Sequence, residues 1–244
     1  MTTDAAGAGG FYTEVTGWGT ERWDGSATPY VMWTANGEAL GGVMSIAPEM
    51  SSAGTSPHWL TYISTPNVEE TVERATALGA TVRVPPASIP TIGRYAILDD
   101  PQGATFALFT PEGEAPEHDT PARVGEFGWH ELATSDLDGA IAFYTTLFGW
   151  DESGEFDLGE GRMYRMFGRN GVQWLGIYVA LTEPPTPPHW LPYARVADIE
   201  SAAKRVTELG GTILWGPMEV PGGDFVLTAL DAQGATFALH EVRG

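Results

Sequence analysis

An internal repeat runs through this chain, and its strongest part keeps one constant spacing. The tripeptide HWL at 58–60 recurs at 189–191, and the heptapeptide QGATFAL at 102–108 recurs at 233–239. Across 58–109, 20 of 52 positions are identical to the residue at the same offset in the second copy, without a gap. Such self-similarity is the signature of a duplicated fold. The chain is therefore expected to contain two copies of one structure.

The front parts of the two copies match more weakly, and their spacing grows. Tyr30 corresponds to Tyr164, at a slightly larger offset, so the second copy carries a short insertion. Residues rich in Pro, Glu and Gly separate the copies, which is typical of a solvated linker. The sequence predicts an N-terminal domain at 1–110, a linker at 111–122 and a C-terminal domain at 123–244.

Each copy in turn looks like two smaller units. Residues 128–134 alternate as a strand does, and Ser135 or Asp136 can cap a helix that ends at Gly149. Short strands follow, and then the pattern of one strand, one helix and three strands starts again at 189, with Asp198 as the cap of its helix. The predicted fold class is α+β, with four βαβββ modules in the chain.

Two segments carry a family resemblance. The helix SDLDGAIAFYTTLFGW at 135–150 and the segment DPQGATFALF at 100–109 resemble modules of the vicinal-oxygen-chelate superfamily, which holds glyoxalases, extradiol dioxygenases and bleomycin-resistance proteins. The layout resembles tandem glyoxalase-like proteins. The resemblance implies two glyoxalase-like domains, in each of which paired modules form a curved sheet around a cleft. It does not fix the reaction, because one fold hosts many functions.

The first module departs from this pattern. Residues 1–4 align with 133–136, so the first strand of module 1 is apparently missing. We expect Met1 to be an internal methionine of a longer natural chain, and one edge of the N-terminal sheet to be bare.

Charge and composition exclude several classes of partner. The chain has 12 basic and 32 acidic side chains, a formal net charge of −20, which repels phosphate backbones and anionic membranes. It has no cysteine, which excludes disulfides and thiolate chemistry. No secretory signal and no run of about 18 apolar residues is evident. We expect a cytoplasmic protein, monomer or homodimer, that binds neither nucleic acid nor membranes.

The resemblance also indicates where a metal would be held. Metal-using members supply a ligand seven residues before the acid that caps the helix, and another four residues after the turn glycine. Here those positions hold apolar side chains: Leu60, Trp129, Leu191, Ala107 and Ala238. None of these can coordinate a divalent ion. We predict no metal and no other cofactor, which argues against glyoxalase I and extradiol dioxygenase chemistry.

The five histidines are expected to differ in role. His58 and His189 each follow a proline, and we interpret them as bonding a neighbouring turn. His130 alternates with Trp129 and should face away from the cleft, and His118 lies in the linker. His240 shares a strand face with Thr236 and is a candidate ligand contact.

Glu131 is the strongest single acid, because alternation places it on the face of Trp129. It is a candidate general base or hydrogen-bond acceptor; a strand-end glutamate bound to the backbone is the alternative. Arg94 could clamp an anionic group, and a surface role is the alternative. Aromatic side chains suit flat apolar ligands, and core packing is the alternative for each of them. The predicted ligand-binding set is Trp33, Met44, Arg94, Phe109, Trp129, Glu131, Tyr178, Thr236 and His240.

The predicted function is metal-independent binding of a small apolar or aromatic metabolite or antibiotic. One alternative is an enzyme, a hydroxylase, lyase or isomerase that uses Glu131 or His240 as its acid–base group. A structural or interaction protein is a third interpretation.

Overall fold

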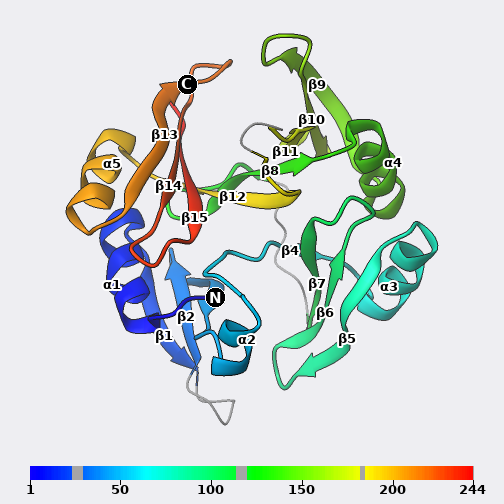
Figure 1. Ribbon diagram of the computed structural model, residues 1–244, viewed down its shortest axis with the longest axis horizontal. Coiled ribbons are helices and arrows are strands. Elements are labelled where there is room, and N and C mark those ends of the chain that lie inside the picture. Colours follow the sequence, from blue (N-terminus) through cyan, green and yellow to red (C-terminus); the bar gives the residue numbers. More distant parts are fainter. Residues whose placement is uncertain (24–29, 114–119, 182–184, 244) are drawn as a thin grey trace. The chain divides into compact units, whose positions relative to one another are not determined.

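A computed structural model describes residues 1–23, 30–113, 120–181 and 185–243 (Figure 1). The chain forms two compact units. Unit 1 consists of Met1–Trp59, Ala122–Gly128 and Pro192–Gly244, and unit 2 consists of Leu60–Pro121 and Trp129–Leu191. Both sequence halves therefore contribute to both units: unit 1 combines the first and fourth predicted modules, and unit 2 the second and third.

The described residues of unit 1 form two groups of strands and two long helices. The strands of its first part run in the order β1-β2-β3, and those of its last part in the order β13-β14-β15-β12. Ahead of α1, an isolated parallel bridge joins Thr2 to Ser45. The elements are α1 (Ala5–Thr16), β1 (Gly19–Trp23), β2 (Tyr30–Ala35), β3 (Glu38–Val43), α2 (Pro48–Ser52), β12 (His189–Arg195), α5 (Ile199–Glu208), β13 (Thr212–Glu219), β14 (Phe225–Leu230) and β15 (Thr236–Glu241).

Unit 2 runs twice through strand, helix and three strands. Its strand orders are β4-β7-β6-β5 and β8-β11-β10-β9, with β4–β7 and β8–β11 parallel and the other pairs antiparallel. The elements are β4 (Tyr62–Ser64), α3 (Val68–Ala77), β5 (Thr81–Ile89), β6 (Gly93–Asp99), β7 (Thr105–Pro111), β8 (Phe127–Thr134), α4 (Leu137–Phe148), β9 (Asp151–Asp157), β10 (Met163–Arg169) and β11 (Val172–Val179). These observations confirm the α+β class.

The helix ends follow the predicted capping residues. Asp136 Oδ1 accepts from the backbone N–H of Gly139 at 3.1 Å, and Asp198 Oδ1 accepts from that of Ser201 at 2.9 Å. Each bond satisfies an otherwise unpaired donor of the first turn. At the other end of α4, Gly149 has φ 69°, the left-handed conformation that favours glycine.

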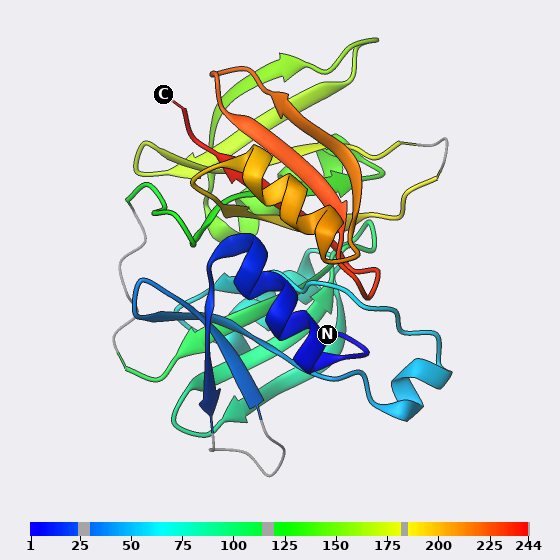
Figure 2. The same ribbon diagram turned by 90° about the vertical axis from the view of Figure 1, so that its left-hand side faces the viewer.

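Each unit buries its helices against one face of its strands. In unit 1, α1 and α5 lie side by side, as the view in Figure 2 shows. Their shared core includes Phe11, Tyr12, Trp18, Trp33 and Phe237. In unit 2, α3 and α4 cover a core that includes Phe106, Leu132, Tyr144 and Phe167. None of the helices in the described part of the chain is long and apolar enough to cross a membrane.

Trp33 corrects one prediction about the binding face. Its side chain is only 2% exposed, and its ring lies 5.6 Å from that of Tyr12 and 5.7 Å from that of Trp18. Alternation along β2 points Trp33 toward the helices, together with Val31 and Ala35. It is a core residue and not a ligand contact.

The same buried hydrogen-bonded chain occurs in both units. In unit 1, Trp59 Nε1 donates to the Tyr12 hydroxyl at 2.8 Å, and Tyr12 donates to Asp231 Oδ2 at 3.0 Å. In unit 2, Trp190 Nε1 donates to the Tyr144 hydroxyl at 2.9 Å, and Tyr144 donates to Asp100 Oδ2 at 3.0 Å. We call these the Trp-Tyr-Asp chains. Both tryptophans therefore contact a helix, α1 in unit 1 and α4 in unit 2.

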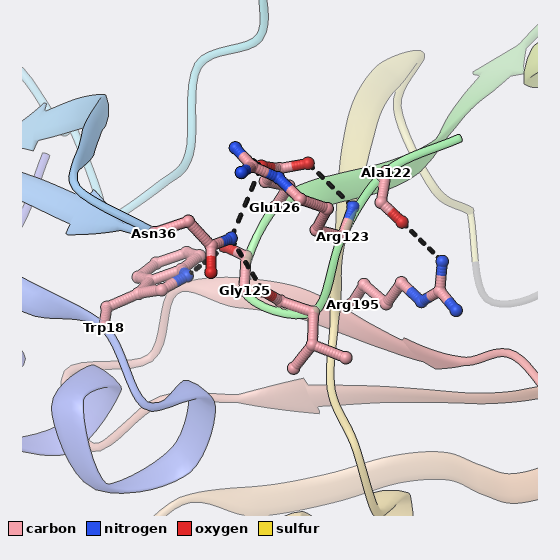
Figure 3. Close-up of polar contacts among 8 residues, drawn as sticks. Trp18, Asn36, Ala122, Arg123, Gly125, Glu126 and Arg195 are labelled. Atoms are coloured by element: carbon pink, nitrogen blue, oxygen red, sulfur yellow. Dashed lines mark hydrogen bonds and ion pairs between the residues drawn. The ribbon is translucent and has the colours of Figure 1, made fainter. Parts of the chain in front are cut away.

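The segment Ala122–Gly128 is fixed to unit 1 by polar contacts (Figure 3). Trp18 Nε1 donates to the carbonyl of Gly125 at 2.6 Å, and Asn36 Nδ2 donates to that of Val124 at 3.1 Å. The Arg195 guanidinium donates to the carbonyl of Ala122. Because Trp18 is buried, its N–H needs this acceptor.

Candidate functional site

The strand β8 has two chemically different faces. Leu132 points into the core of unit 2, so alternation places Trp129 and Glu131 on the opposite face, away from the helices. The next strands add Tyr178 of β11 and Tyr164 of β10 to the same face, since these two residues are register partners.

A short hydrogen-bonded chain joins these residues. Trp129 Nε1 donates to the Tyr164 hydroxyl at 2.8 Å, and Tyr164 donates to Glu131 Oε1 at 2.9 Å. The prediction that Trp129 and Glu131 share one face is confirmed by these contacts. Trp129 thus fixes the Tyr164 hydroxyl, and the hydroxyl in turn orients the Glu131 carboxylate.

A glycine makes this arrangement possible. Gly176 is the β11 partner of Glu131, and a Cβ atom there would stand 2.0 Å from the Tyr164 ring. The ring of Tyr164 therefore crosses β11 directly above Gly176 to reach β8. Any other residue would place a Cβ atom in the space of the ring, so the glycine is required for the contact between Tyr164 and Glu131.

Two further rings stack on Tyr164. The ring of Phe156 lies at 4.7 Å with an interplanar angle of 23°, and that of Tyr178 lies at 5.8 Å with an angle of 15°. Stacked rings present flat apolar surface. We call Trp129, Glu131, Phe156, Tyr164 and Tyr178 the aromatic–carboxylate cluster.

The electrostatics keep the tyrosines protonated. Burial raises the pKa of the Tyr164 hydroxyl far above its usual range, and the negative charge of Glu131 raises it further. The same two causes raise the pKa of Tyr178. Both hydroxyls therefore act as hydrogen-bond donors at neutral pH. The cluster can hold a flat ring by stacking and a ligand N–H or O–H at the carboxylate.

The predicted residues of the second module divide between two faces. Phe109 lies on the face opposite the core, and its ring contacts that of Tyr62 at 6.4 Å. Arg94 lies on the helix face with Leu98, where it forms an ion pair with Glu69 at the start of α3. The structure thus gives Arg94 a partner on the helix side, away from Phe109 and from the face expected to bind a ligand.

The predicted residues of unit 1 lie on a separate face. Thr236 and His240 are on the side of β15 opposite the core residue Leu239. His240 Nε2 bonds Asp224 Oδ2 at 3.0 Å. Met44, just after β3, is about half exposed.

The remaining histidines have local partners. The Nδ1 atoms of His58 and His189 bond the carbonyls of Ser56 and Pro187, at 2.8 and 2.9 Å, which confirms the predicted turn contacts. His130 lies on the face of Leu132, and burial lowers its pKa to about 4. His118 lies outside the described residues.

A divalent metal of the kind that the fold implies does not fit the side chains present. Leu60, Trp129, Leu191, Ala107 and Ala238 hold the positions where ligands would be needed, and none has a suitable donor atom. Within the described ranges, no three His, Asp or Glu side chains converge closely enough to hold an ion.

Sequence reasoning missed Tyr164, Phe156 and Asp224. A signal for Tyr164 was present: Tyr30 and Gly42 recur as Tyr164 and Gly176 at one spacing, and a Cβ at Gly42 would likewise meet the ring of Tyr30. The repeated pairing of tyrosine with glycine could have indicated a ring crossing the next strand. Phe156 carried no such signal.

Comparisons with known proteins cover nearly the whole chain. Residues 126–239 match the Glyoxalase/Bleomycin resistance protein/Dioxygenase superfamily, and residues 1–109 match a Glyoxalase-like domain. CFP32 of Mycobacterium bovis, provisionally named as a glyoxylase, is 31% identical over 247 residues, covering 98% of this chain and 91% of the relative.

Two further proteins extend the comparison. The anthracycline biosynthesis protein DauV of a Streptomyces species is 27% identical, covering 98% of this chain and 90% of its own length. The Mn(II)-bound glyoxalase of Novosphingobium aromaticivorans aligns with a TM-score of 0.63 at 15% identity, over 98% of this chain and 79% of that structure. The likeness to that structure concerns the fold alone.

Proposed function

Because this chain belongs to the glyoxalase/bleomycin resistance/dioxygenase superfamily, with a glyoxalase domain in each half, we propose that it binds a small, flat aromatic molecule without a metal. The ligand lies on the aromatic–carboxylate cluster of unit 2. The observation that carries this proposal is the chain from Trp129 through Tyr164 to Glu131, set among stacked rings on the face away from the core.

The cluster supports this ligand class in two ways. Tyr178 and Trp129 are partly exposed and offer aromatic surface, which favours a planar apolar body. Glu131 is the polar anchor, because a carboxylate held by Tyr164 accepts a hydrogen bond from a ligand hydroxyl or amine. The relative named as an anthracycline biosynthesis protein is consistent with an aromatic ligand.

The test uses 1,4-dihydroxyanthraquinone as the probe, with the dissociation constant measured by quenching of tryptophan fluorescence. We expect Glu131→Gln and Tyr178→Leu each to weaken binding about 5- to 10-fold, since each removes one of the two recognition elements. Glu155→Gln is the matched control: it neutralises an exposed carboxylate of β9 that pairs with Arg165. Added Mn²⁺ or a chelator should leave the affinity unchanged.

Two results would overturn the proposal. One is equal affinity of the wild-type protein, Glu131→Gln and Tyr178→Leu for the probe. The other is binding that appears only with added Mn²⁺, which would mean that donors other than those at the expected positions hold a metal. Thermal unfolding of each variant separates lost binding from lost structure.

An enzyme is the second candidate function. The hydrogen bond from Tyr164 to Glu131, and the contact of His240 with Asp224, are both arrangements that orient an acid–base group. A lyase or isomerase would convert a bound probe to a different product, and a hydroxylase would do so when dioxygen and a reductant are added. Chromatography and mass spectrometry of the probe after prolonged incubation distinguish this candidate from binding alone.

A further inference from the structure

Two hairpin turns of the chain carry the same dipeptide. Asn36-Gly37 joins β2 to β3 in unit 1, and Asn170-Gly171 joins β10 to β11 in unit 2. The φ angles are 54° and 83° in the first turn and 53° and 80° in the second, so both asparagines adopt the left-handed conformation. Because the two turns have the same sequence and nearly the same φ angles, they form a matched pair that differs in its surroundings.

The side chain of Asn36 anchors the segment Ala122–Gly128, which we call the strap. Asn36 Nδ2 donates to the carbonyl of Val124 at 3.1 Å and to Glu126 Oε1 at 3.4 Å (Figure 3). Both partners are acceptors, so only a group that donates hydrogens fits between them. An amide meets that requirement. A carboxylate in its place would face a carbonyl oxygen and a second carboxylate.

The strap also bonds a tryptophan of the aromatic core of unit 1. Trp18 is 1% exposed, and its Nε1 atom donates to the carbonyl of Gly125 at 2.6 Å. Within the strap, the backbone N–H of Glu126 donates to the carbonyl of Arg123 at 3.0 Å, which closes a turn around the bond between Arg123 and Val124. A protease cleaves an extended chain, so this peptide bond is protected while the strap keeps its turn. Release of the strap would expose it and take an acceptor from Trp18.

An asparagine followed by glycine has a chemical route to a carboxylate. The backbone nitrogen of Gly37 attacks Cγ of Asn36 and forms a new N–C bond. The bond between Cγ and Nδ2 breaks, and ammonia leaves with the proton of the Gly37 amide. Water then opens the cyclic imide at one of its carbonyl carbons, which leaves an aspartate or an isoaspartate. A Cβ atom placed on Gly37 would have no described atom within 4 Å beyond its chain neighbours, so other residues do not crowd the attacking nitrogen.

We propose that Asn36 is a site of spontaneous deamidation, and that the reaction releases the strap from unit 1. The docked strap slows the reaction, because Val124 and Glu126 hold the amide nitrogen and Cγ cannot turn freely toward Gly37. When the strap opens transiently, this restraint is lost and the amide reacts. The carboxylate that forms repels Glu126 and cannot donate to Val124, so docking is then disfavoured. A reversible opening becomes a lasting one.

The first experiment follows the modification itself. The purified protein is incubated at neutral and at mildly alkaline pH, and peptide mapping by mass spectrometry measures aspartate and isoaspartate at residue 36. We expect conversion at both, and faster conversion at the higher pH, because the attacking nitrogen must lose its proton. Trp18→Phe removes the bond to Gly125 but keeps an aromatic ring, and it should speed the conversion about fivefold by loosening the strap. Asn36→Gln is the control, because its longer side chain closes the larger ring far more slowly.

The second experiment follows the strap. Limited digestion with trypsin is measured at the bond after Arg123, in Asn36→Asp and in the matched variant Asn170→Asp. Each variant adds one negative charge at the same position of an equivalent turn. We expect Asn36→Asp to speed this cleavage about tenfold relative to wild type, whereas Asn170→Asp leaves it unchanged. Circular dichroism checks that both variants stay folded.

Three results would overturn the proposal. One is an unchanged Asn36 in the folded protein under conditions in which the unfolded chain reacts. Another is conversion of Asn170 alone, since the equivalent turn would then be the reactive one. The third is equal cleavage after Arg123 in wild type and in folded Asn36→Asp. The binding proposed for unit 2 is tested with other variants and another probe, so the two proposals can fail independently.

Discussion

The two units have nearly identical buried polar contacts and different exposed faces. The Trp-Tyr-Asp chains join the same atoms, with lengths of 2.8 and 3.0 Å in unit 1 and of 2.9 and 3.0 Å in unit 2. On the faces away from the helices, by contrast, unit 2 has Glu131 bonded to Tyr164, whereas unit 1 has His240 bonded to Asp224. Duplication therefore preserved one part of the structure and allowed another to change.

The physical reason lies in the cost of an unpaired buried group. If Asp100 or Asp231 changes, a buried tyrosine hydroxyl and two backbone N–H groups lose their acceptor at once. Residues of the exposed faces have fewer such partners, so they can change singly or in pairs. The Trp-Tyr-Asp chains are therefore required by the fold, whereas residues of the exposed faces are free to change with the ligand that is bound.

The largest expected effect comes from the aspartates. Asp100→Ala and Asp231→Ala should each lower the free energy of unfolding by about 3 kcal/mol or more, because each leaves three donors unpaired. The two values should agree within about 1 kcal/mol, since the contacts are the same. Denaturant unfolding of each variant, with hydrogen exchange monitored separately in each unit, measures both free energies. A cost under about 1 kcal/mol for either aspartate would contradict the equivalence of the two chains.

Acidification should affect unit 2 through His130. Its pKa is lowered from 6.5 to about 4 by burial, so the unfolded state binds more protons between these values. The contribution of His130 is fully present above pH 6.5 and is lost as the pH falls toward 4. We expect a loss of about 2–3 kcal/mol in the free energy of unfolding.

The comparison variant for this experiment is His130→Asn, which does not titrate. Asp100 acts in the opposite direction, because burial raises its pKa and protonation then stabilises the folded state. The difference between wild type and His130→Asn isolates the histidine. An equal pH dependence of the two proteins between 4 and 6.5 would show that His130 charges freely in the folded state.

Glycine substitutions compare the rings that cross a strand in each unit. Gly176→Ala and Gly42→Ala should each cost about 1–3 kcal/mol, because the new Cβ meets Tyr164 or Tyr30 at 2.0 Å. Only Gly176→Ala should also weaken binding of 1,4-dihydroxyanthraquinone, since it moves Tyr164 from Glu131. Gly41→Ala is the control, with no atom within 4 Å of the added Cβ. If Gly176→Ala leaves binding unchanged, Tyr164 does not contribute to recognition of the ligand.

The smallest effect concerns the pair His240 and Asp224. Replacing both by the residues of the second module, with His240→Phe and Asp224→Gly, should change the free energy of unfolding by less than about 1 kcal/mol. The double variant should cost less than the two single changes added together, because each single change leaves one partner unpaired. Additive effects in this double-mutant cycle would mean that the two side chains act separately.

Much of the fold was predictable because the repeat fixed the alternation of elements. Cap residues such as Asp136 and Asp198 mark helix starts by local chemistry, and they were found. The choice of module partners was not predictable. Residues 59 and 190 are both tryptophan, and residues 12 and 144 are both tyrosine. The same tryptophan–tyrosine contacts could therefore form with either pairing of the modules.

The candidate site was predicted where the face of a strand that meets the core was identified correctly. Trp129 and Glu131 follow the regular alternation of β8. Trp33 alternates regularly too, with Val31 and Ala35, but that face of β2 is the one packed into the core. Arg94 was judged from its place near a turn rather than from the core residues of its strand, so its ion pair with Glu69 was missed. No pattern marks which polar pair forms on an exposed face.

The division of the chain between the units sets an order for folding during synthesis. Unit 2 is complete once Leu191 has left the ribosome, whereas unit 1 needs Pro192–Gly244 as well. The early segment Met1–Trp59, with the apolar helix α1, must wait for its partner while unit 2 forms between them. Unit 2 can thus be complete while Met1–Trp59 still lacks the rest of unit 1.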